Sequence, residues 1–553
     1  MKILILGGYG IFGGRLARLV SGDDRLHLFI AGRSLEKAKA FCESLPPGAH
    51  RSPVVFDRDG DVDKQLEEIK PDLVIDGTGP FQIYKGDPYA VVKSCIANQI
   101  NYMDFADGSG FVKGVSQFDK QAKDKNIFIL SGVSSFPVLS AAVVRKLSVG
   151  VKKINSIRAG IAPSPYAIVG LNVIRAITAY AGKPIQRRKG GKIIYSHALT
   201  ETTRYTVKPP GYIPVKNTVF SLVDVPDLQV LPEIWTDLDE IWIGAGPTPE
   251  ILHRMLIGLS WLVKLKIIPS LLPFASLFHF VINHLRWGEH RGGMFVEIQG
   301  LSEDDENITR SWHMLAEGDS GPFIPSMGLE AIILKMLSGE KPESGSRPAT
   351  MDLELEDYDE MFKDWNIFHG VRDSRDETHP YLYRRLLGNA WETLPESIRA
   401  MHLASLAEGV ADVERGRNIF ARIMSQLMGF PDPGTSIPVK VEFIKRDGGE
   451  LWKRTFGNAK FSSFQKQGTG KYDGLLMEQF GPFQFGIALV VEGERLRLVP
   501  RYWNFLGIRL PLALAPQTET YEHENNGRFH FYVEIRHKLV GLIIRYQGYL
   551  QPA

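Results

Sequence analysis

The chain has 553 residues, a length that corresponds to roughly two to four domains. Of these residues 44% are hydrophobic and 23% charged, which is typical of a folded globular protein. Its 65 lysines and arginines nearly balance 63 aspartates and glutamates, so no net charge favours nucleic acid as a partner. Two cysteines, Cys42 and Cys95, cannot form a disulfide framework, and no signal peptide is recognisable, so we expect a cytoplasmic protein.

Strands and helices alternate through residues 1–135. The stretches KILIL, LHLFIAG, SPVVFD, DLVIDGTG and NIFILSG are typical of buried strands, whereas GGRLARLV, LEKAKAFCESL, DKQLEEI and DPYAVVKSCIANQ are typical of helices. This alternation predicts a parallel sheet with helices on both faces, which is a doubly wound, Rossmann-type α/β domain.

The rest of the chain divides into three further parts. Residues 136–340 predict an α+β domain for substrate binding or oligomerisation, and its last helix stops at Gly339. Residues 341–379 are polar and acidic and are interpreted as a linker. Residues 380–553 start with helical patterns and continue as alternating strands, with a hairpin expected around Asp447-Gly448-Gly449. They predict a C-terminal α+β domain of unknown role, built on an antiparallel sheet.

Five glycines fall in the eight residues GGYGIFGG, between the first strand and the first helix. Gly8, Gly10 and Gly13 have the G-x-G-x-x-G spacing of a dinucleotide-binding loop. In that interpretation Gly8 permits the turn, Gly10 admits the pyrophosphate, and Gly13 lets the helix pack closely on the strand. The helix N-terminus then faces the phosphates. The expected contacts are Gly8, Tyr9, Gly10, Ile11, Phe12 and Gly13; a tight turn without a ligand is the alternative.

The end of the second strand favours NADP(H) over NAD. It reads Gly32-Arg33-Ser34, where an NAD site usually has an acidic residue for the ribose. Arg33 can pair with a 2′-phosphate, Ser34 can donate a hydroxyl, and Lys37 adds positive charge. Asp57 is placed to reach the adenine, and Thr78, Gly79 and Pro80 end the fourth strand at the same edge. The alternative is that Arg33 and Asp57 are ordinary surface and turn residues.

The motifs GGYGIFGG, AGRS, GTGPFQIYKGDPYAVVKSCIANQINYMDFADG and AEGDSGPFIP together resemble the saccharopine dehydrogenase-like family over about residues 1–340. The resemblance implies an NADP(H)-dependent oxidoreductase acting on imines or enoyl groups. It also implies that Gly79, Pro80 and Phe81 lie beside the nicotinamide, with Tyr102 and Asp104 near it. The stretch GVSSFPVLSAAVV replaces the Gly-Leu-Asp-Pro-Gly signature of saccharopine-forming members, so saccharopine is not the expected substrate. Residues 380–553 resemble an uncharacterised domain fused behind such modules.

Most such reductions need a proton donor or acceptor. Tyr102, Asp104 and Tyr84 are the candidates, and packing or loop capping is the alternative interpretation of each. The sequence has no metal-binding motif. The basic run from Arg187 to Lys192 is interpreted as a solvated loop, and a contact with a phosphate or lipid headgroup is the alternative.

Residues Ile251 to Trp287 form a long apolar region. Within it, 267–285 contain no Lys, Arg, Asp or Glu, but their prolines, histidines and Asn283 argue against a membrane span. We expect this region to line a hydrophobic substrate pocket or an oligomer interface, such as a homodimer. Peripheral membrane contact is the alternative.

Two functions follow from these observations. The first is an NADP(H)-dependent oxidoreductase that reduces a C=N, C=O or C=C bond of a small hydrophobic substrate, because no surplus of arginines marks a site for a small dicarboxylate. The second is a non-enzymatic nucleotide-binding protein associated with lipids or membranes, since no acid–base residue is unambiguous.

Overall fold

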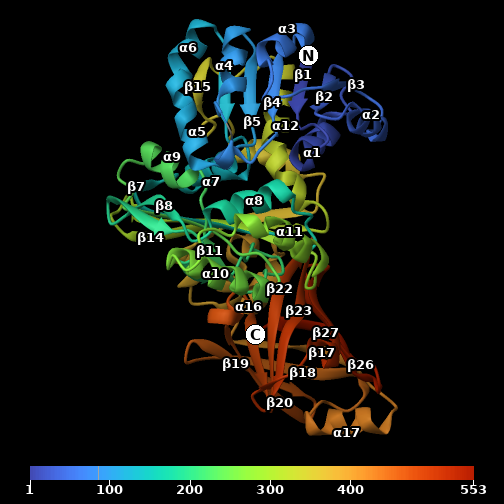
Figure 1. Ribbon diagram of the computed structural model, residues 1–553. Coiled ribbons are helices and arrows are strands. Elements are labelled where there is room, and N and C mark those ends of the chain that lie inside the picture. The colour runs from blue at the N-terminus through green and yellow to red at the C-terminus, as the bar shows by residue number, and fades with distance from the viewer. Residues whose placement is uncertain (85) are drawn as a thin grey trace. The chain divides into compact units, whose positions relative to one another are not determined.

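The computed structural model describes residues 1–84 and 86–553, drawn in Figure 1. The chain forms two compact units. The first comprises Met1–Tyr205, Thr218–Trp312 and Ala316–Ile367, and the second Thr206–Asn217, His313–Leu315 and Phe368–Ala553.

The N-terminal part of the first unit is built on a parallel sheet with the order β15-β6-β5-β4-β1-β2-β3. Its strands are β1 (Lys2–Leu6), β2 (His27–Gly32), β3 (His50–Val55), β4 (Leu73–Asp76), β5 (Asn101–Asp104), β6 (Phe128–Ser131) and β15 (Gly345–Pro348). This confirms the predicted Rossmann-type sheet, with β5 and β15 as additional strands. Their sequences, NYMD and GSRP, lack the apolar run that marks the equally short β4 (LVID) and β6 (FILS).

Helices cover this sheet: α1 (Ile11–Val20), α2 (Leu35–Ser44), α3 (Val62–Ile69), α4 (Ala90–Ala97), α5 (Ser109–Gly114), α6 (Asp119–Asp124) and α12 (Ile324–Leu337). The helix that follows β6, α7 (Ser140–Leu147), packs instead against the strand at Arg291–Ser302 in the middle of the chain. Leu4 and Leu6 alternate with Ile3 and Ile5 along β1, so each pair serves one face. Leu4 and Leu6 join Leu66 of α3 in one buried cluster. Because both faces are covered, β1 is apolar throughout instead of alternating with polar residues.

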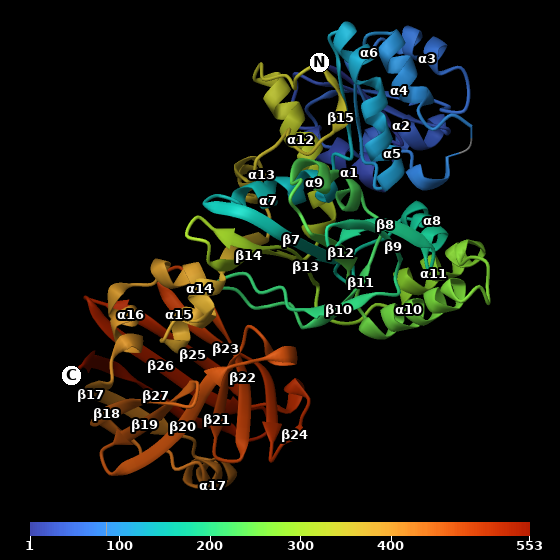
Figure 2. The same ribbon diagram turned by 90° about the vertical axis from the view of Figure 1, so that its left-hand side faces the viewer.

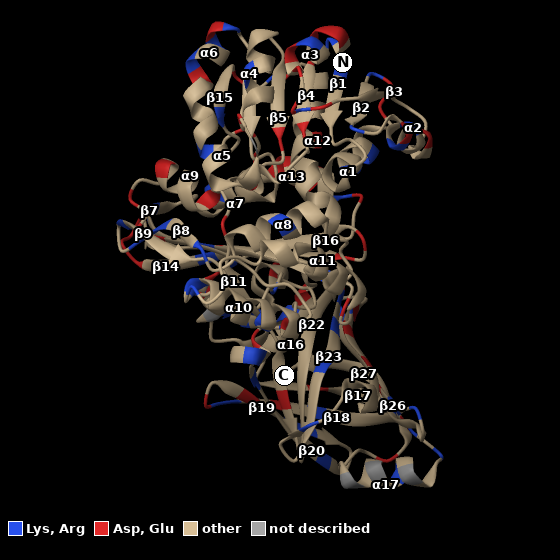
Figure 3. Ribbon diagram, viewed as in Figure 1, with Lys and Arg blue, Asp and Glu red and all other residues tan. Residues whose placement is uncertain are grey.

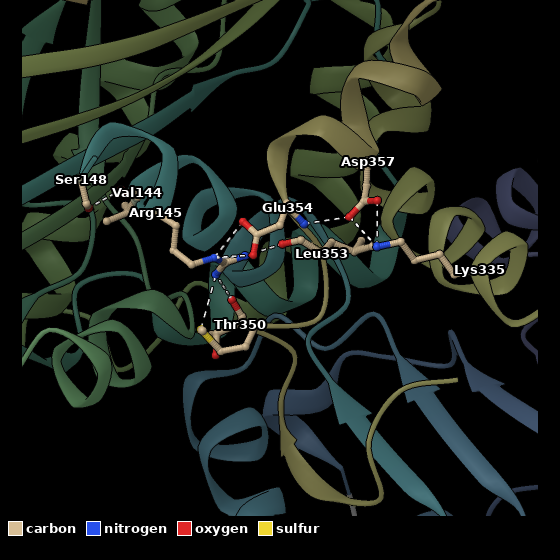
Figure 4. Close-up of polar contacts among 9 residues, drawn as sticks. Val144, Arg145, Ser148, Lys335, Thr350, Leu353, Glu354 and Asp357 are labelled. Carbon is tan, nitrogen blue, oxygen red and sulfur yellow. Dashed lines mark hydrogen bonds and ion pairs between the residues drawn. The ribbon is translucent and has the colours of Figure 1, made fainter. Parts of the chain in front are cut away.

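Residues 341–379 differ from the expected linker. They contain β15, which pairs with β6, and then α13 (Leu355–Phe362), β16 (Ile367–Asp373) and α14 (Ser374–Glu377). Figure 4 shows how Arg145 of α7 holds this segment: it binds the Thr350 and Leu353 carbonyls and lies 3.0 Å from both Glu354 carboxylate oxygens. Two of the acidic residues that suggested a linker, Glu354 and Asp357, therefore form the capping box of α13, and Glu354 also pairs with the distant Arg145.

A mixed sheet forms the middle of the chain, and six of its strands run in the order β10-β11-β12-β7-β13-β14 (Figure 2). They are β7 (Val151–Ala162), β10 (Thr202–Tyr205), β11 (Thr218–Leu222), β12 (Glu240–Ala245), β13 (Arg291–Ser302) and β14 (Asn307–Glu317). The accompanying helices are α8 (Leu171–Tyr180), α9 (Asp227–Ile234), α10 (Glu250–Lys264) and α11 (Ala275–His284).

The interpretation of Arg187–Lys192 as a solvated loop is wrong. These residues belong to a hairpin of β8 (Pro184–Lys189) and β9 (Lys192–His197). Arg187 is 2% exposed and pairs with Glu201 at 2.8 Å and Glu240 at 3.1 Å. A buried arginine needs carboxylate partners, and here both lie far along the sequence.

The apolar region 251–287 forms α10 and α11 and leaves many large apolar side chains exposed. Among them are Ile251, Met255, Leu265, Ile267, Leu277 and Phe280, each more than half exposed. No charged residue interrupts α11 (Figure 3). Within residues 1–84 and 86–553, no helix is both long and apolar enough to cross a membrane.

Ten antiparallel strands of the second unit close into a barrel in the order β22-β21-β20-β19-β18-β17-β27-β26-β25-β23, with β23 pairing back to β22. The strands are β17 (Leu406–Arg415), β18 (Gly434–Arg446), β19 (Gly449–Phe456), β20 (Ala459–Gln467), β21 (Leu476–Phe480), β22 (Phe483–Glu492), β23 (Arg495–Phe505), β25 (Gln517–Asn525), β26 (Arg528–His537) and β27 (Gly541–Pro552), with short β24 (Ile508–Arg509) beside β23. This confirms the antiparallel sheet. The expected hairpin joins β18 and β19, with positive φ at Asp447 and Gly448.

Three further helices accompany the barrel: α15 (Leu382–Leu387), α16 (Glu396–Leu403) and α17 (Ile419–Leu427). Figure 2 shows α15 and α16 near one end of the barrel and α17 near the other. Their buried residues Tyr383 and Met401 belong to the same apolar cluster as the barrel interior.

Candidate functional site

A cavity of about 1110 Å³ lies in the first unit, at the carboxyl ends of β1, β2 and β4. Ligands of open α/β sheets bind at this edge. The cavity is bounded on one side by the glycine loop and on the other by the start of α8 and residues 272–276. Its size exceeds that of most small-molecule pockets and suits a dinucleotide together with a substrate.

The glycine loop approaches its own strand so closely that side chains are excluded. Gly7, not Gly8, makes the left-handed turn, with φ of +68°. Gly8 instead lies against β2, where its N–H donates to the Ala31 carbonyl at 3.0 Å. A Cβ at Gly13 would lie 2.6 Å from the Gly7 carbonyl oxygen, which explains the close packing of α1 on β1.

The start of α1 suits a pyrophosphate. Gly10 is the N-cap and supplies no side-chain acceptor for the first N–H groups of the helix, and no acidic residue lies in the first turn. These N–H groups and the positive end of the helix favour an anion. Tyr9, Gly10, Ile11 and Phe12 all line the cavity.

Of the four cofactor residues predicted at the second and third strand ends, two line the cavity. Arg33 is exposed and lines the cavity, as does Asp57, whose carboxylate also accepts the Asp59 N–H at 3.1 Å. Ser34 and Lys37 are not among the lining residues. Ser34 caps α2 by accepting the Lys37 N–H at 3.3 Å, and its own N–H donates to the Tyr9 hydroxyl at 3.1 Å.

Tyr84 and Thr78 form a hydrogen-bonded chain that ends on a buried carboxylate. The Thr78 hydroxyl donates to Asp76 at 2.6 Å and lies 3.0 Å from the Tyr84 hydroxyl. Since the single threonine proton is used, Tyr84 donates to Thr78. Burial, then the Asp76 charge, raises the pKa of Tyr84, and the Arg58 guanidinium lies over its ring, 3.3 Å from the centroid. Tyr84 thus keeps its proton at neutral pH.

Gly79, Pro80 and Phe81 line the same cavity between Thr78 and Tyr84. The Asn172 side chain of α8 donates to the Gly79 carbonyl at 2.7 Å, which ties this loop to α8. The loop expected beside the nicotinamide therefore meets the part of the first unit that is expected to hold substrate.

Asp107 is a cavity residue that the sequence analysis missed. It accepts a hydrogen bond from the Gln82 amide at 2.9 Å and lines the cavity with Tyr84. Burial, helped by the negative charge of Asp224, raises the pKa of Asp107 even though the Gln82 hydrogen bond opposes this shift. The only signal in the sequence was its position, three residues beyond Asp104 in the stretch DFADG.

Tyr102 and Asp104 lie outside the cavity. Tyr102, a residue of β5, is 0% exposed and its side chain lies in the core. Asp104 is also 0% exposed and accepts the N–H groups of Ala106 and Gly132 at 2.9 and 2.7 Å. Burial raises the pKa of Asp104 to about 7. Its placement fits the capping of two loops at the strand ends, which was the alternative interpretation.

The far side of the cavity is largely apolar. Leu171, Val173 and Ala176 of α8 face it together with Leu272, Pro273 and Ala275. Arg175 is the cation on this side. Part of the apolar region thus lines the cavity, whereas most of α10 and α11 does not.

Two family models match the chain. Residues 3–130 match the saccharopine dehydrogenase NADP-binding domain, and residues 394–550 match the domain of unknown function DUF4166. The expected resemblance is therefore confirmed: the N-terminal domain is of the saccharopine dehydrogenase type, fused to a C-terminal DUF4166 domain. The first match supports an NAD(P)-dependent oxidoreductase with a nicotinamide dinucleotide cofactor.

Several solved dehydrogenase structures align with parts of this chain. Apo saccharopine dehydrogenase (L-Glu forming) from Saccharomyces cerevisiae aligns over 67% of this chain and 99% of its own, with 14% identity and a TM-score of 0.47. A probable dehydrogenase from Thermotoga maritima aligns over 67% and 98%, with 10% identity and a TM-score of 0.32. None of the curated proteins compared with the chain matches it.

Proposed function

We propose that the protein is an NADP(H)-dependent reductase that acts on a C=N, C=O or C=C bond of a small hydrophobic substrate. The observation that carries the proposal is one cavity that joins the glycine loop and Arg33 to Tyr84, Asp107 and an apolar wall. Bound NADPH would supply the hydride. The residues of the chain bind and orient the reactants, exclude water and deliver a proton.

The cofactor preference rests on Arg33 at the end of β2. A guanidinium can bind a 2′-phosphate with two hydrogen bonds, and the position has no carboxylate that would bind a ribose hydroxyl. The phosphates would lie at the start of α1, and Gly79, Pro80 and Phe81 would flank the nicotinamide.

Asp107 is the proton donor in this proposal, and Tyr84 positions the reacting group. A general acid works best when its pKa lies near the working pH. Burial moves the pKa of Asp107 upward toward neutrality, whereas it moves the pKa of Tyr84 further away. The Tyr84 hydroxyl donates its single proton to Thr78, and its oxygen can accept a hydrogen bond from an N–H or O–H of the substrate.

A hydrophobic substrate is supported by the apolar wall of α8 and residues 272–275. Arg175 would receive a polar or anionic end of such a molecule. This arrangement differs from a site for a small dicarboxylate, which needs several placed charges.

The test follows NADPH oxidation with a panel of acyl and prenyl carbonyl compounds against saccharopine-like amino acids. For the best substrate, Asp107→Asn should lower kcat by about a hundredfold or more and remove the alkaline limb of the pH profile, where the natural enzyme loses rate as Asp107 gives up its proton. Tyr84→Phe should lower kcat less and leave that limb in place. Turnover of the amino acids alone would contradict the hydrophobic substrate.

The second candidate function, a non-enzymatic nucleotide-binding protein at a membrane surface, is favoured by the exposed apolar side chains of α10 and α11. NADPH binding without turnover of any substrate in the panel would support it. Turnover that depends on Asp107 would exclude it.

A further inference from the structure

The closed barrel of the second unit contains a cavity of about 230 Å³. Protein interiors are normally packed without voids of this size, and small barrels fill their interior with side chains or hold one small ligand. The residues that line it come from the barrel strands, from α15 and α16, as Tyr383 and Met401 do, and from the segment after α17, as Phe430 does.

The wall of this cavity is mostly aromatic and aliphatic. Along β26, Phe529, Phe531, Val533 and Ile535 face inward and line the cavity, which is the alternation expected for one face of a strand. Across from Val533, its partner Thr520 on β25 also lines it. The neighbouring Glu519 is exposed, on the outer face.

One end of the cavity is polar. Arg454 of β19 lies 3.6 Å from Glu478 of β21, and Ser463 bridges them, accepting from Arg454 at 2.8 Å and donating to Glu478 at 2.7 Å. The Arg454 and Glu478 side chains are 15% and 18% exposed, and both line the cavity. They therefore offer hydrogen-bonding groups to whatever occupies it.

The charges in the wall argue against an anionic ligand. Arg454 is paired with Glu478, and the second carboxylate in the wall, Glu522, lies 2.7 Å from the His402 ring nitrogen Nε2. A carboxylate or phosphate would be buried beside two glutamates without a cation of its own, which is costly. An uncharged ligand avoids this cost.

We propose that the C-terminal barrel binds one uncharged, mostly apolar small molecule, with its polar group at the Arg454–Glu478 end. This binding site is independent of the proposed reductase activity, because all its residues belong to the second unit.

The test uses the full-length protein saturated with NADPH and two dyes with the same ring system. N-phenyl-1-naphthylamine is uncharged, and 8-anilino-1-naphthalenesulfonate adds a sulfonate. Fluorescence titration should show saturable one-to-one binding of the uncharged dye. The anionic dye should bind at least about tenfold more weakly, since it brings an uncompensated charge into the wall.

Variants that fill the cavity locate the dye. Thr520→Trp and Val533→Phe add volume inward from two paired strands and should each weaken the uncharged dye by about tenfold or more. Glu519→Trp, on the outer face of β25, is the matched control and should bind as the natural protein does. Thermal unfolding of each variant checks that its barrel is folded.

A double variant, Arg454→Met with Glu478→Met, removes the polar end without leaving a lone charge. It should weaken the uncharged dye, which has an N–H group, by about tenfold. Equal binding of the two dyes by the natural protein overturns the proposal. So does the absence of saturable one-to-one binding, or unchanged binding to a folded Thr520→Trp or Val533→Phe variant.

Discussion

Reversing the charge at Arg33 tests which dinucleotide the first domain binds. In Arg33→Asp the guanidinium that lines the cavity at the end of β2 becomes a carboxylate. The change should weaken NADPH strongly, because a carboxylate repels the 2′-phosphate. NADH, which has a ribose hydroxyl there, should lose little and can gain an acceptor for that hydroxyl.

The expected magnitude follows from the exposure of this residue. A hydrogen bond to a charged group contributes about 1.5–3 kcal/mol, which corresponds to roughly 10- to 150-fold in affinity. Arg33 is exposed, so solvent screening favours the lower end of that range. We therefore expect NADPH affinity to fall by about tenfold to thirtyfold and NADH affinity to change by less than about threefold.

Lys37→Asp is the matched control. It makes the same charge reversal one turn along α2, at an exposed residue that is not among those lining the cavity. Isothermal titration of both cofactors against both variants separates a direct contact between Arg33 and the 2′-phosphate from the general effect of nearby positive charge. The assignment of Arg33 is refuted if NADPH and NADH weaken equally in Arg33→Asp, or if Lys37→Asp weakens NADPH as much.

Three further predictions concern pH, stability and membranes. Burial raises the pKa of Asp227 to about 7, so the folded state binds the extra proton and the free energy of unfolding should fall as pH rises from about 4 to 7. Asp227→Asn should remove up to about 4 kcal/mol of that fall in urea unfolding; an unchanged pH dependence would show that this carboxyl is not responsible. Arg187→Ala leaves Glu201 and Glu240 without their cation and should lower the free energy of unfolding by about 3 kcal/mol. This is the low end for a broken buried pair, because both glutamates are partly exposed. Lys189→Ala, at an exposed side chain, should lower the free energy of unfolding by less than about 0.5 kcal/mol in the same assay. We also propose that α10 and α11 contact a membrane surface, so Phe280→Glu should reduce sedimentation of the protein with phosphatidylcholine–phosphatidylserine vesicles. If the variant and the natural protein sediment equally with the vesicles, or if the variant dissociates a dimer in analytical ultracentrifugation, the surface is a subunit interface instead.

Features with a local cause could be predicted from the sequence. A backbone that must pass close to a ligand or a strand needs glycine, so the loop from Gly8 to Gly13 is recognisable without any tertiary information. The residue at the end of a strand is also read directly from the sequence, which is why Arg33 could be predicted at the edge of the sheet where it lines the cavity. The alternation in β26 and the Asp447-Gly448 turn likewise predicted an antiparallel hairpin sheet, because strand period and turn conformation are set by neighbouring residues.

Features that depend on residues far apart in the sequence were decided by the tertiary structure. Asp107 becomes a candidate acid only because the loop after β5 folds against Gln82 and the cavity, while Tyr102, five residues before Asp107, is directed into the core. Arg187 is buried because Glu201 and Glu240 lie beside it in space. Closure of the barrel depends on β17 pairing with β27 and β22 with β23, and an alternating strand pattern is the same in an open sheet and in a closed one. The cavity inside it therefore has no counterpart in the sequence, since a void is a property of how ten strands meet and not of any one of them.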